Sequence, residues 1–245
     1  MTDSALSIPR VTYLEAAASA VDLIGDERVA SRWHEESVLP GMTVGVLAAH
    51  LGRSLTQVEF LLDLDLDLDR DVDPGLDSGP DLDGRREAGG GPGSTDVVVI
   101  DASTYFGTFE GIADRESDVS RGVIRRGTES AEKGVVAVVA QCRETLDRLR
   151  SRLASEPAGR RLGVAHRPGE IISLDDYLRT RLVEFAVHTD DLSLSIGAAV
   201  TSPPAALAAA VDVLVGAARV RHGDLAVLRA LSRRERDESD ALHVL

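Results

Sequence analysis

The segment from Ser173 to Gly197 constrains the fold most, because its pattern is that of a helix with a polar side facing the protein interior. Ser173 followed by Asp176 forms a capping box, and Gly197 is typical of a residue just past a helix end. Residues three and four apart form one narrow polar stripe, made of Tyr177, Arg181, Glu184, His188 and Asp191. Apolar residues flank this stripe on both sides, whereas an ordinary surface helix has one apolar stripe and a broad polar face. The sequence therefore predicts an inward polar stripe that needs partners inside the protein.

The composition favours helices and excludes several classes of partner. Hydrophobic residues make up 43% of the 245 residues but aromatic residues only 3%, so the core must consist mainly of Ala, Val and Leu. The net charge of −14 argues against a nucleic acid or an anionic membrane as partner. No leader-like segment opens the chain and no apolar run approaches the roughly 20 residues of a spanning helix, so we expect a cytoplasmic protein. The single cysteine, Cys142, excludes an internal disulfide and a cysteine-cluster metal site.

Hydrophobic periodicity predicts an all-α fold, a four-helix bundle with extra C-terminal helices. Before the capped helix we expect three helices: one capped by Ser7 and ending at Gly25, one from Thr43 to about Leu62, and a long one from about Glu129 to Ala154. After it we expect a helix opened by Pro203 and Pro204, and another from Asp224 to about Arg236. We assign residues 1–197 to the bundle and 198–245 to a short helical extension.

Three connections lack a clear period. The first, after Gly25, contains Trp33, and we expect an ordered loop pinned by that indole. Residues 96–127 are poorly patterned, and their aromatic residues indicate a segment packed onto the bundle. The stretch from Arg160 to Ile172 contains Pro168-Gly169 and predicts a turn that leads into the capped helix.

Residues 63–95 have a different composition from the rest of the chain. Residues 63–87 hold ten acidic residues and three arginines, so this part alone carries half of the net charge. The Asp-Leu alternation formally matches a strand, but Asp is a poor strand former and the continuation is rich in Gly and Pro. A calcium loop would need Gly at its sixth position and Glu at its twelfth, and Arg70 and Leu76 stand there when the loop starts at Asp65. We therefore expect a disordered acidic insertion that is dispensable for folding.

His50, Glu184 and His188 are the candidate metal ligands. Glu184 and His188 are one helical turn apart, and His50 lies on the apolar line of the helix that follows Thr43. Two histidines and one carboxylate are a common catalytic zinc set that leaves a coordination position open. From spacing alone, a histidine on an apolar helix line such as His50 is more often a hydrogen-bonded core residue than a metal ligand. The remaining histidines lie in segments that look exposed, and we expect solvated side chains for His34, His166, His222 and His243.

Two segments carry a resemblance to a known family. W-x6-PGMTVGVLAAHL (Trp33 to Leu51) and DYLRTRLVEFAVHTDDLSLSIG (Asp176 to Gly197) resemble the signature segments of the mycothiol-dependent maleylpyruvate isomerase family, an actinobacterial branch of the DinB-like metal-binding four-helix bundles. The resemblance implies that His50, Glu184 and His188 hold a divalent metal ion, most simply Zn²⁺. The tail after Gly197 is about 50 residues long, which is shorter than the separate α/β domain of the isomerase itself.

The same resemblance implies an enzyme that uses mycothiol, an external thiol, as a metal-bound nucleophile on a small electrophile, as an S-transferase or isomerase. The chain's own thiol fits less well, because Cys142 lies in the middle of an apolar helix face. Arg181 can hold Glu184 or receive a substrate carboxylate, and Asp191 can accept the ring N–H of His188. We expect a monomer or homodimer. Two alternatives stay open: a non-catalytic protein that binds a metal or small ligand, and an accessory protein that docks a partner through the acidic insertion.

Overall fold

The computed structural model describes residues 6–64, 97–109, 117–164, 167–232 and 242–244. Residues 65–95 of the acidic insertion, His166 and the end of the last predicted helix lie outside these residues, whereas Asp63 belongs to a helix and not to the insertion. In the described part helices dominate, with one small sheet, which confirms the predicted all-α class. The elements in chain order are α1 (Ile8–Ile24), α2 (Glu27–Ser31), α3 (Val44–Asp63), β1 (Val98–Ile100), α4 (Ala102–Gly107), α5 (Asp118–Ala131), α6 (Val135–Ser155), β2 (Arg161–Gly163), β3 (Glu170–Ser173), α7 (Leu174–Ile196), α8 (Pro204–His222) and α9 (Asp224–Ser232).

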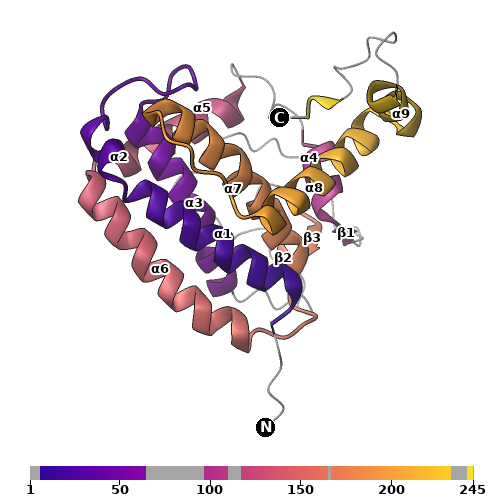
Figure 1. The fold of residues 1–245 in the computed structure, drawn as a ribbon. Coiled ribbons are helices and arrows are strands. Elements are labelled where there is room, and N and C mark those ends of the chain that lie inside the picture. Colours follow the sequence, from indigo (N-terminus) through magenta and orange to yellow (C-terminus); the bar gives the residue numbers. More distant parts are fainter. Residues whose placement is uncertain (1–5, 65–96, 110–116, 165–166, 233–241, 245) are drawn as a thin grey trace.

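Four long helices, α1, α3, α6 and α7, pack around one core, and α5 lies along α3 (Figure 1). The core is mostly aliphatic, as the composition requires, and its fully buried members include Leu47, Leu51, Leu55 and Leu149. Phe185 from α7 is also fully buried and packs against Tyr13 of α1, with ring centroids 5.5 Å apart. This packing turns one side of α7 toward α3. No helix in the described part of the chain is long and apolar enough to span a membrane.

The helix ends follow local capping chemistry at most of the predicted positions. The Thr43 hydroxyl accepts a hydrogen bond from the backbone N–H of Val46, and the Ser173 hydroxyl accepts one from Asp176. Gly197 ends α7 in the left-handed conformation, with φ of 65°. Ser7 precedes α1 as expected, but its side chain makes no capping hydrogen bond, so that detail of the prediction is wrong.

The predicted helix from Glu129 to Ala154 is two helices. Gly134 separates α5 from α6 with φ of 82°, a backbone conformation that no helix interior contains. Helix α5 begins already after Ser117, whose hydroxyl accepts a hydrogen bond from Ser120 N–H, within the stretch that showed no period. Most of α5 is only partly buried, and its apolar side, Val119, Val123 and Ile124, spans little more than one helical turn, too little to give a clear period.

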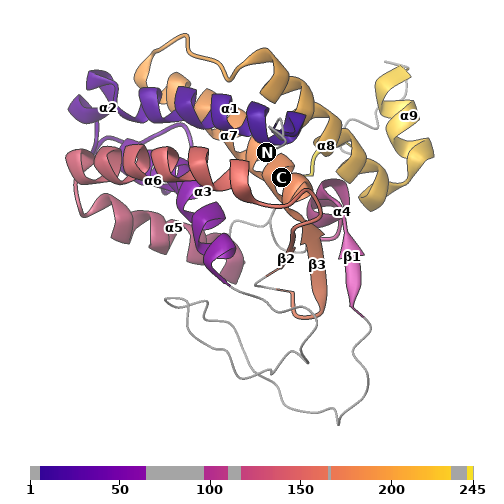
Figure 2. The same ribbon diagram turned by 90° about the horizontal axis from the view of Figure 1, so that it is seen from below.

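The expected turn at Pro168-Gly169 is present, closed by a hydrogen bond from Glu170 N–H to the Arg167 carbonyl oxygen at 3.1 Å, but it joins strands of a three-stranded sheet that we did not predict. Strands β2 and β3 form an antiparallel hairpin around Gly169, and β1 adds to β3 in parallel, with Val99 opposite Ile171. The strand order is β1-β3-β2 (Figure 2). Leu162 and Ile172 are buried against the bundle, whereas the side chains of Val98 and Val99 are more than half exposed. These strands of three or four residues are too short to show a strand period in the sequence.

The residues after α7 continue the helical fold. Helix α8 packs on α7 and α4, and α9 packs on α8 (Figure 1). The contact between α4 and α8 is very close: a Cβ added to Gly107 would lie 2.6 Å from the Cβ of Val220. The structure therefore contains the two helices expected after Gly197, with α9 described as far as Ser232.

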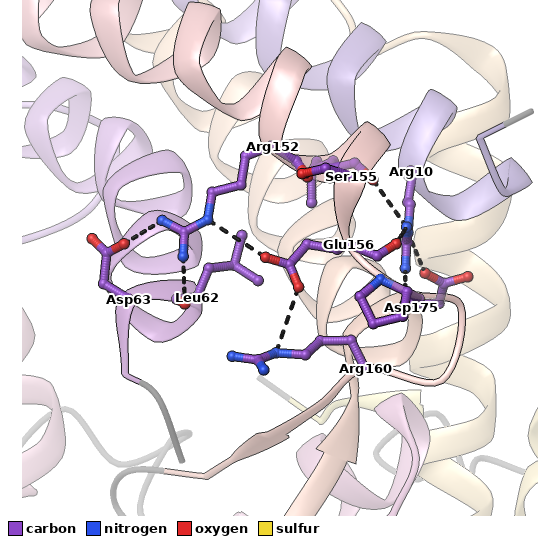
Figure 3. A network of polar contacts seen from close by, with 10 residues as sticks. Arg10, Leu62, Asp63, Arg152, Ser155, Glu156, Arg160 and Asp175 are labelled. Atoms are coloured by element: carbon purple, nitrogen blue, oxygen red, sulfur yellow. Dashed lines mark hydrogen bonds and ion pairs between the residues drawn. The ribbon is translucent and has the colours of Figure 1, made fainter. Parts of the chain in front are cut away.

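Arginine side chains link the ends of several helices through hydrogen bonds and ion pairs (Figure 3). The buried guanidinium of Arg10 donates hydrogen bonds to the carbonyl oxygens of Leu153, Glu156 and Pro157, at 2.9, 2.6 and 2.9 Å. Its Nε also donates to Asp175 of α7, at 3.0 Å. Arg10 thus satisfies free carbonyl groups at the C-terminus of α6 and links α1, α6 and α7.

Candidate metal centre

His50, Glu184 and His188 lie together between α3 and α7. The Nε2 atom of His50 is 3.6 Å from Glu184 Oε2, and the Nε2 atom of His188 is 3.4 Å from that same oxygen. The two imidazole rings meet edge to face, with centroids 4.7 Å apart. Each residue offers one ligand atom, and all these atoms lie within 4.8 Å of one another. The geometry therefore joins residues that are more than 130 positions apart in the sequence.

The local sequence explains why these side chains converge. The predicted inward stripe of α7 is confirmed, because Tyr177 and Arg181 are buried and the three candidate ligands are only 15 to 18% exposed. His50 follows Leu47 on the core-facing side of α3, one turn further along. The inward face of α3 thus places an imidazole opposite the polar stripe of α7.

Asp191 holds His188 by its second ring nitrogen. Its Oδ2 atom lies 3.0 Å from His188 Nδ1, and both side chains are about one-fifth exposed. This contact leaves His188 Nε2 directed toward Glu184. A carboxylate on the outer nitrogen of a ligand histidine fixes its orientation and raises its basicity.

Arg181 lies on the other side of Glu184. Its Nη2 atom is 3.9 Å from Glu184 Oε1, and its Nη1 atom donates a hydrogen bond to Gln57 Oε1 at 3.0 Å. The guanidinium also stacks 5.0 Å from the ring centroid of Tyr177. These contacts match the predicted role of Arg181 in positioning Glu184.

Burial and charge act against each other on the three ligands. Burial alone would raise the pKa of Glu184, but the contacts with His188 and His50 and the charge of Arg181 lower that pKa well below its usual range. Burial alone would lower the pKa of His188, but Asp191 and Glu184 raise it to about 9. The pKa of His50 is lowered, chiefly by burial. In the metal-free state the carboxylate is therefore ionised and one imidazole is readily neutral.

The donor set fits a divalent metal ion. Distances of 3.4 and 3.6 Å are too long for strong hydrogen bonds. They do match two ligands on one tetrahedral ion, because donors about 2.1 Å from the ion lie about 3.4 Å apart. His50 Nδ1 is also buried without a hydrogen-bond partner in the described residues. No hydrogen bond there at Nδ1 therefore holds the ring away from a metal ion at Nε2. Two imidazoles and one carboxylate suit zinc and leave a coordination position open.

The other predicted residues lie apart from this centre. His34, His222 and His243 are exposed and do not join the set. Cys142 is buried, as predicted, and burial raises the pKa of its thiol to about 11. A thiol with that pKa is almost wholly protonated near neutral pH and is a poor nucleophile.

Next to the candidate centre lies a cleft of about 480 Å³ that the sequence did not indicate. Helices α3, α5 and α6 contribute most of its wall, and Tyr105, Val164 and Tyr177 add to it. Gln57 lines the cleft and holds Arg181, so the cleft and the candidate ligands share a wall. Arg53 follows His50 by three residues on α3 and also lines the cleft, which was the one signal available in the sequence.

Comparison with known proteins identifies the family. The model of the family described as mycothiol maleylpyruvate isomerase N-terminal domain matches residues 14–193, a span that contains His50, Glu184 and His188. Searches of curated proteins and of solved structures give no match. Because the matched span covers most of the 245 residues, this chain belongs to the mycothiol maleylpyruvate isomerase N-terminal domain family.

Proposed function

We propose that this protein binds one divalent metal ion, zinc, through His50, Glu184 and His188, and uses it to react a thiol with a small electrophile. The convergence of these three side chains, with ligand atoms within 4.8 Å of one another, carries the proposal. The family match supports mycothiol as the thiol. The reaction is an S-transfer or a thiol-assisted isomerisation.

The need for an external thiol rests on the chain's own residues. Cys142 is the only cysteine, and its thiol is buried, with a pKa raised to about 11. A divalent ion with an open position supplies Lewis acidity, which lowers the pKa of a thiol that reaches it. The substrate thiol therefore takes the role that Cys142 does not fill.

The surrounding residues hold the ligands in place. Asp191 fixes the His188 ring through Nδ1 and leaves Nε2 free to ligate. Arg181 lies beside Glu184 and is itself held by Gln57 and Tyr177, which keeps the carboxylate turned toward the two imidazoles. The neighbouring cleft of about 480 Å³ offers room for a small substrate.

The test is a turnover assay with zinc-loaded protein, mycothiol and a small chromogenic electrophile such as a chlorodinitroarene. We expect thiol consumption that depends on both metal and mycothiol and that falls at least 100-fold in Glu184→Gln. Glu15→Gln, which changes an exposed carboxylate on α1 away from the cleft, is the matched control and should retain activity. Bound zinc with no thiol-dependent turnover for a panel of electrophiles would contradict catalysis and favour the non-catalytic metal-binding alternative.

A further inference from the structure

Two arginines line the cleft beside the metal centre, and neither forms an ion pair with an acidic residue in the described part of the chain. Arg53 comes from α3 and Arg126 from α5. Neither guanidinium makes a hydrogen bond or ion pair to a carboxylate of the described residues, and Nε of Arg126 is buried with no hydrogen-bond partner there. The nearby carboxylate of Glu129 instead pairs with Arg125, at 3.7 Å.

The positive charges of Arg53 and Arg126 repel each other. Burial lowers the pKa of Arg53, and the charge of Arg126 lowers it further. Burial also lowers the pKa of Arg126, followed by the charge of Arg125. The charge of Glu129 acts in the opposite direction on both arginines but does not cancel these effects. Partly buried like charges are unfavourable, and a bound anion relieves both the desolvation and the repulsion.

Apolar and aromatic residues form one part of the remaining cleft wall, and polar or charged side chains form the other: Thr56, Gln57, Glu129, Ser130, Lys133 and Gln141. Its apolar members come from α3, α6 and the segment before β3, and the set is Ala49, Phe60, Leu61, Val138 and Val164. The rings of Tyr105 and Tyr177 complete this side. A volume of about 480 Å³ lies within the range of small-ligand sites. Such a wall suits an apolar body, and the two guanidinium groups suit one anionic end.

The cleft adjoins the candidate ligands on two sides. A Cβ added to Gly127, the residue after Arg126, would lie 4.0 Å from the Cβ of His50. Tyr177 stacks on Arg181, which reaches Glu184. Residues of the cleft wall therefore adjoin the neighbours of the candidate ligands, although no candidate ligand lines the cleft itself.

We propose that this cleft binds a small organic monocarboxylate, with its carboxylate on Arg53 and Arg126 and its apolar body against Phe60, Val138 and Tyr177. This ligand is the electrophilic substrate, a step that rests on the proposed function. The binding itself requires only the two arginines and the apolar wall.

Isothermal titration of zinc-loaded protein at low ionic strength tests the proposal with three probes: 4-phenylbutyrate, the uncharged 4-phenylbutanol, and succinate. We expect 4-phenylbutyrate to bind at least tenfold more tightly than the other two. Arg53→Gln and Arg126→Gln should each raise its Kd at least tenfold. Arg121→Gln is the matched control, because Arg121 lies on α5, is 59% exposed and pairs with Asp118.

Several results would overturn the proposal. Equal binding of the acid and the alcohol would remove the role of the arginines, and tighter binding of succinate would remove the role of the apolar wall. No binding of any probe, or an equal loss in Arg121→Gln, would also refute it. Arg126→Lys retains the charge and should bind the acid better than Arg126→Gln, which guards against a folding defect. Zinc content, measured on each variant, should stay unchanged, so a failed cleft is distinguishable from a failed metal centre.

Discussion

Replacing Asp191 by alanine should weaken zinc binding by about 10- to 100-fold without unfolding the protein. Asp191 Oδ2 lies 3.0 Å from His188 Nδ1, and both side chains are about one-fifth exposed. A hydrogen bond with a charged partner contributes about 1.5–3 kcal/mol, and partial exposure favours the lower part of that range. Since tenfold in affinity corresponds to about 1.4 kcal/mol, the structure and the general effect of outer ligand partners agree on the expected loss.

Competition with a chromogenic chelator measures this loss directly. Asp190→Ala is the control, because Asp190 is the adjacent carboxylate on α7 and is exposed. Asp191→Asn should fall between wild type and Asp191→Ala, since an amide oxygen can still accept the ring N–H but carries no charge. Equal zinc affinities for Asp190→Ala and Asp191→Ala would refute the role assigned to Asp191.

Four further predictions follow from burial and charge. Zinc affinity should rise about tenfold per pH unit between pH 7 and 9, because the metal must displace a proton from His188, whose pKa is raised to about 9. A zinc affinity that does not change with pH would show that this imidazole is already neutral. The same shift should stabilise the metal-free fold below about pH 6.5 and lose that contribution as the pH rises through 9, as thermal melts would show. Cys142→Ser should retain thiol-dependent turnover at a cost of about 1–3 kcal/mol in the free energy of unfolding, and abolished turnover in a folded variant would make Cys142 the nucleophile. Arg10→Ala should lower the free energy of unfolding, measured with denaturant, by about 2–4 kcal/mol, because carbonyl groups at the end of α6 lose their buried partner. A loss under about 0.5 kcal/mol would contradict the role of this network.

Features decided by neighbouring residues could be predicted from the sequence. Thr43, Ser173 and Gly197 mark helix ends through contacts within four residues, so their roles do not depend on the tertiary fold. Gly134 shows the limit of this reasoning. A single glycine does not by itself end a predicted helix, and the positive φ of Gly134 in the folded chain reveals the break between α5 and α6. The pairing of β1 with β3 joins segments about 70 residues apart and has no local signal.

The candidate site also has one part that could be predicted from the sequence and one part that could not. Glu184 and His188 lie on one helix, so their spacing alone brings them together, and His50 was indicated by its place on an apolar face. The cleft lined by Arg53 and Arg126 depends on how α5 packs against α3. That contact is possible because Gly127 lacks a side chain, and an added Cβ would lie 3.0 Å from Cγ1 of Val46. The sequence of residues 96–127 does not indicate that α5 packs against α3, so the role of Arg126 could not be predicted from the sequence.

The most direct test of the account is the metal content of purified protein supplied with zinc. We predict about one equivalent in wild type and a sharp loss in each of His50→Ala, Glu184→Ala and His188→Ala, while His34→Ala, which removes an exposed imidazole, retains the metal. Chelation should lower the melting temperature of wild type, because a ligand that binds only the native state stabilises it. Unchanged zinc in all three ligand variants would contradict the account. So would a well-folded wild type that retains no zinc, nickel or manganese when each is supplied.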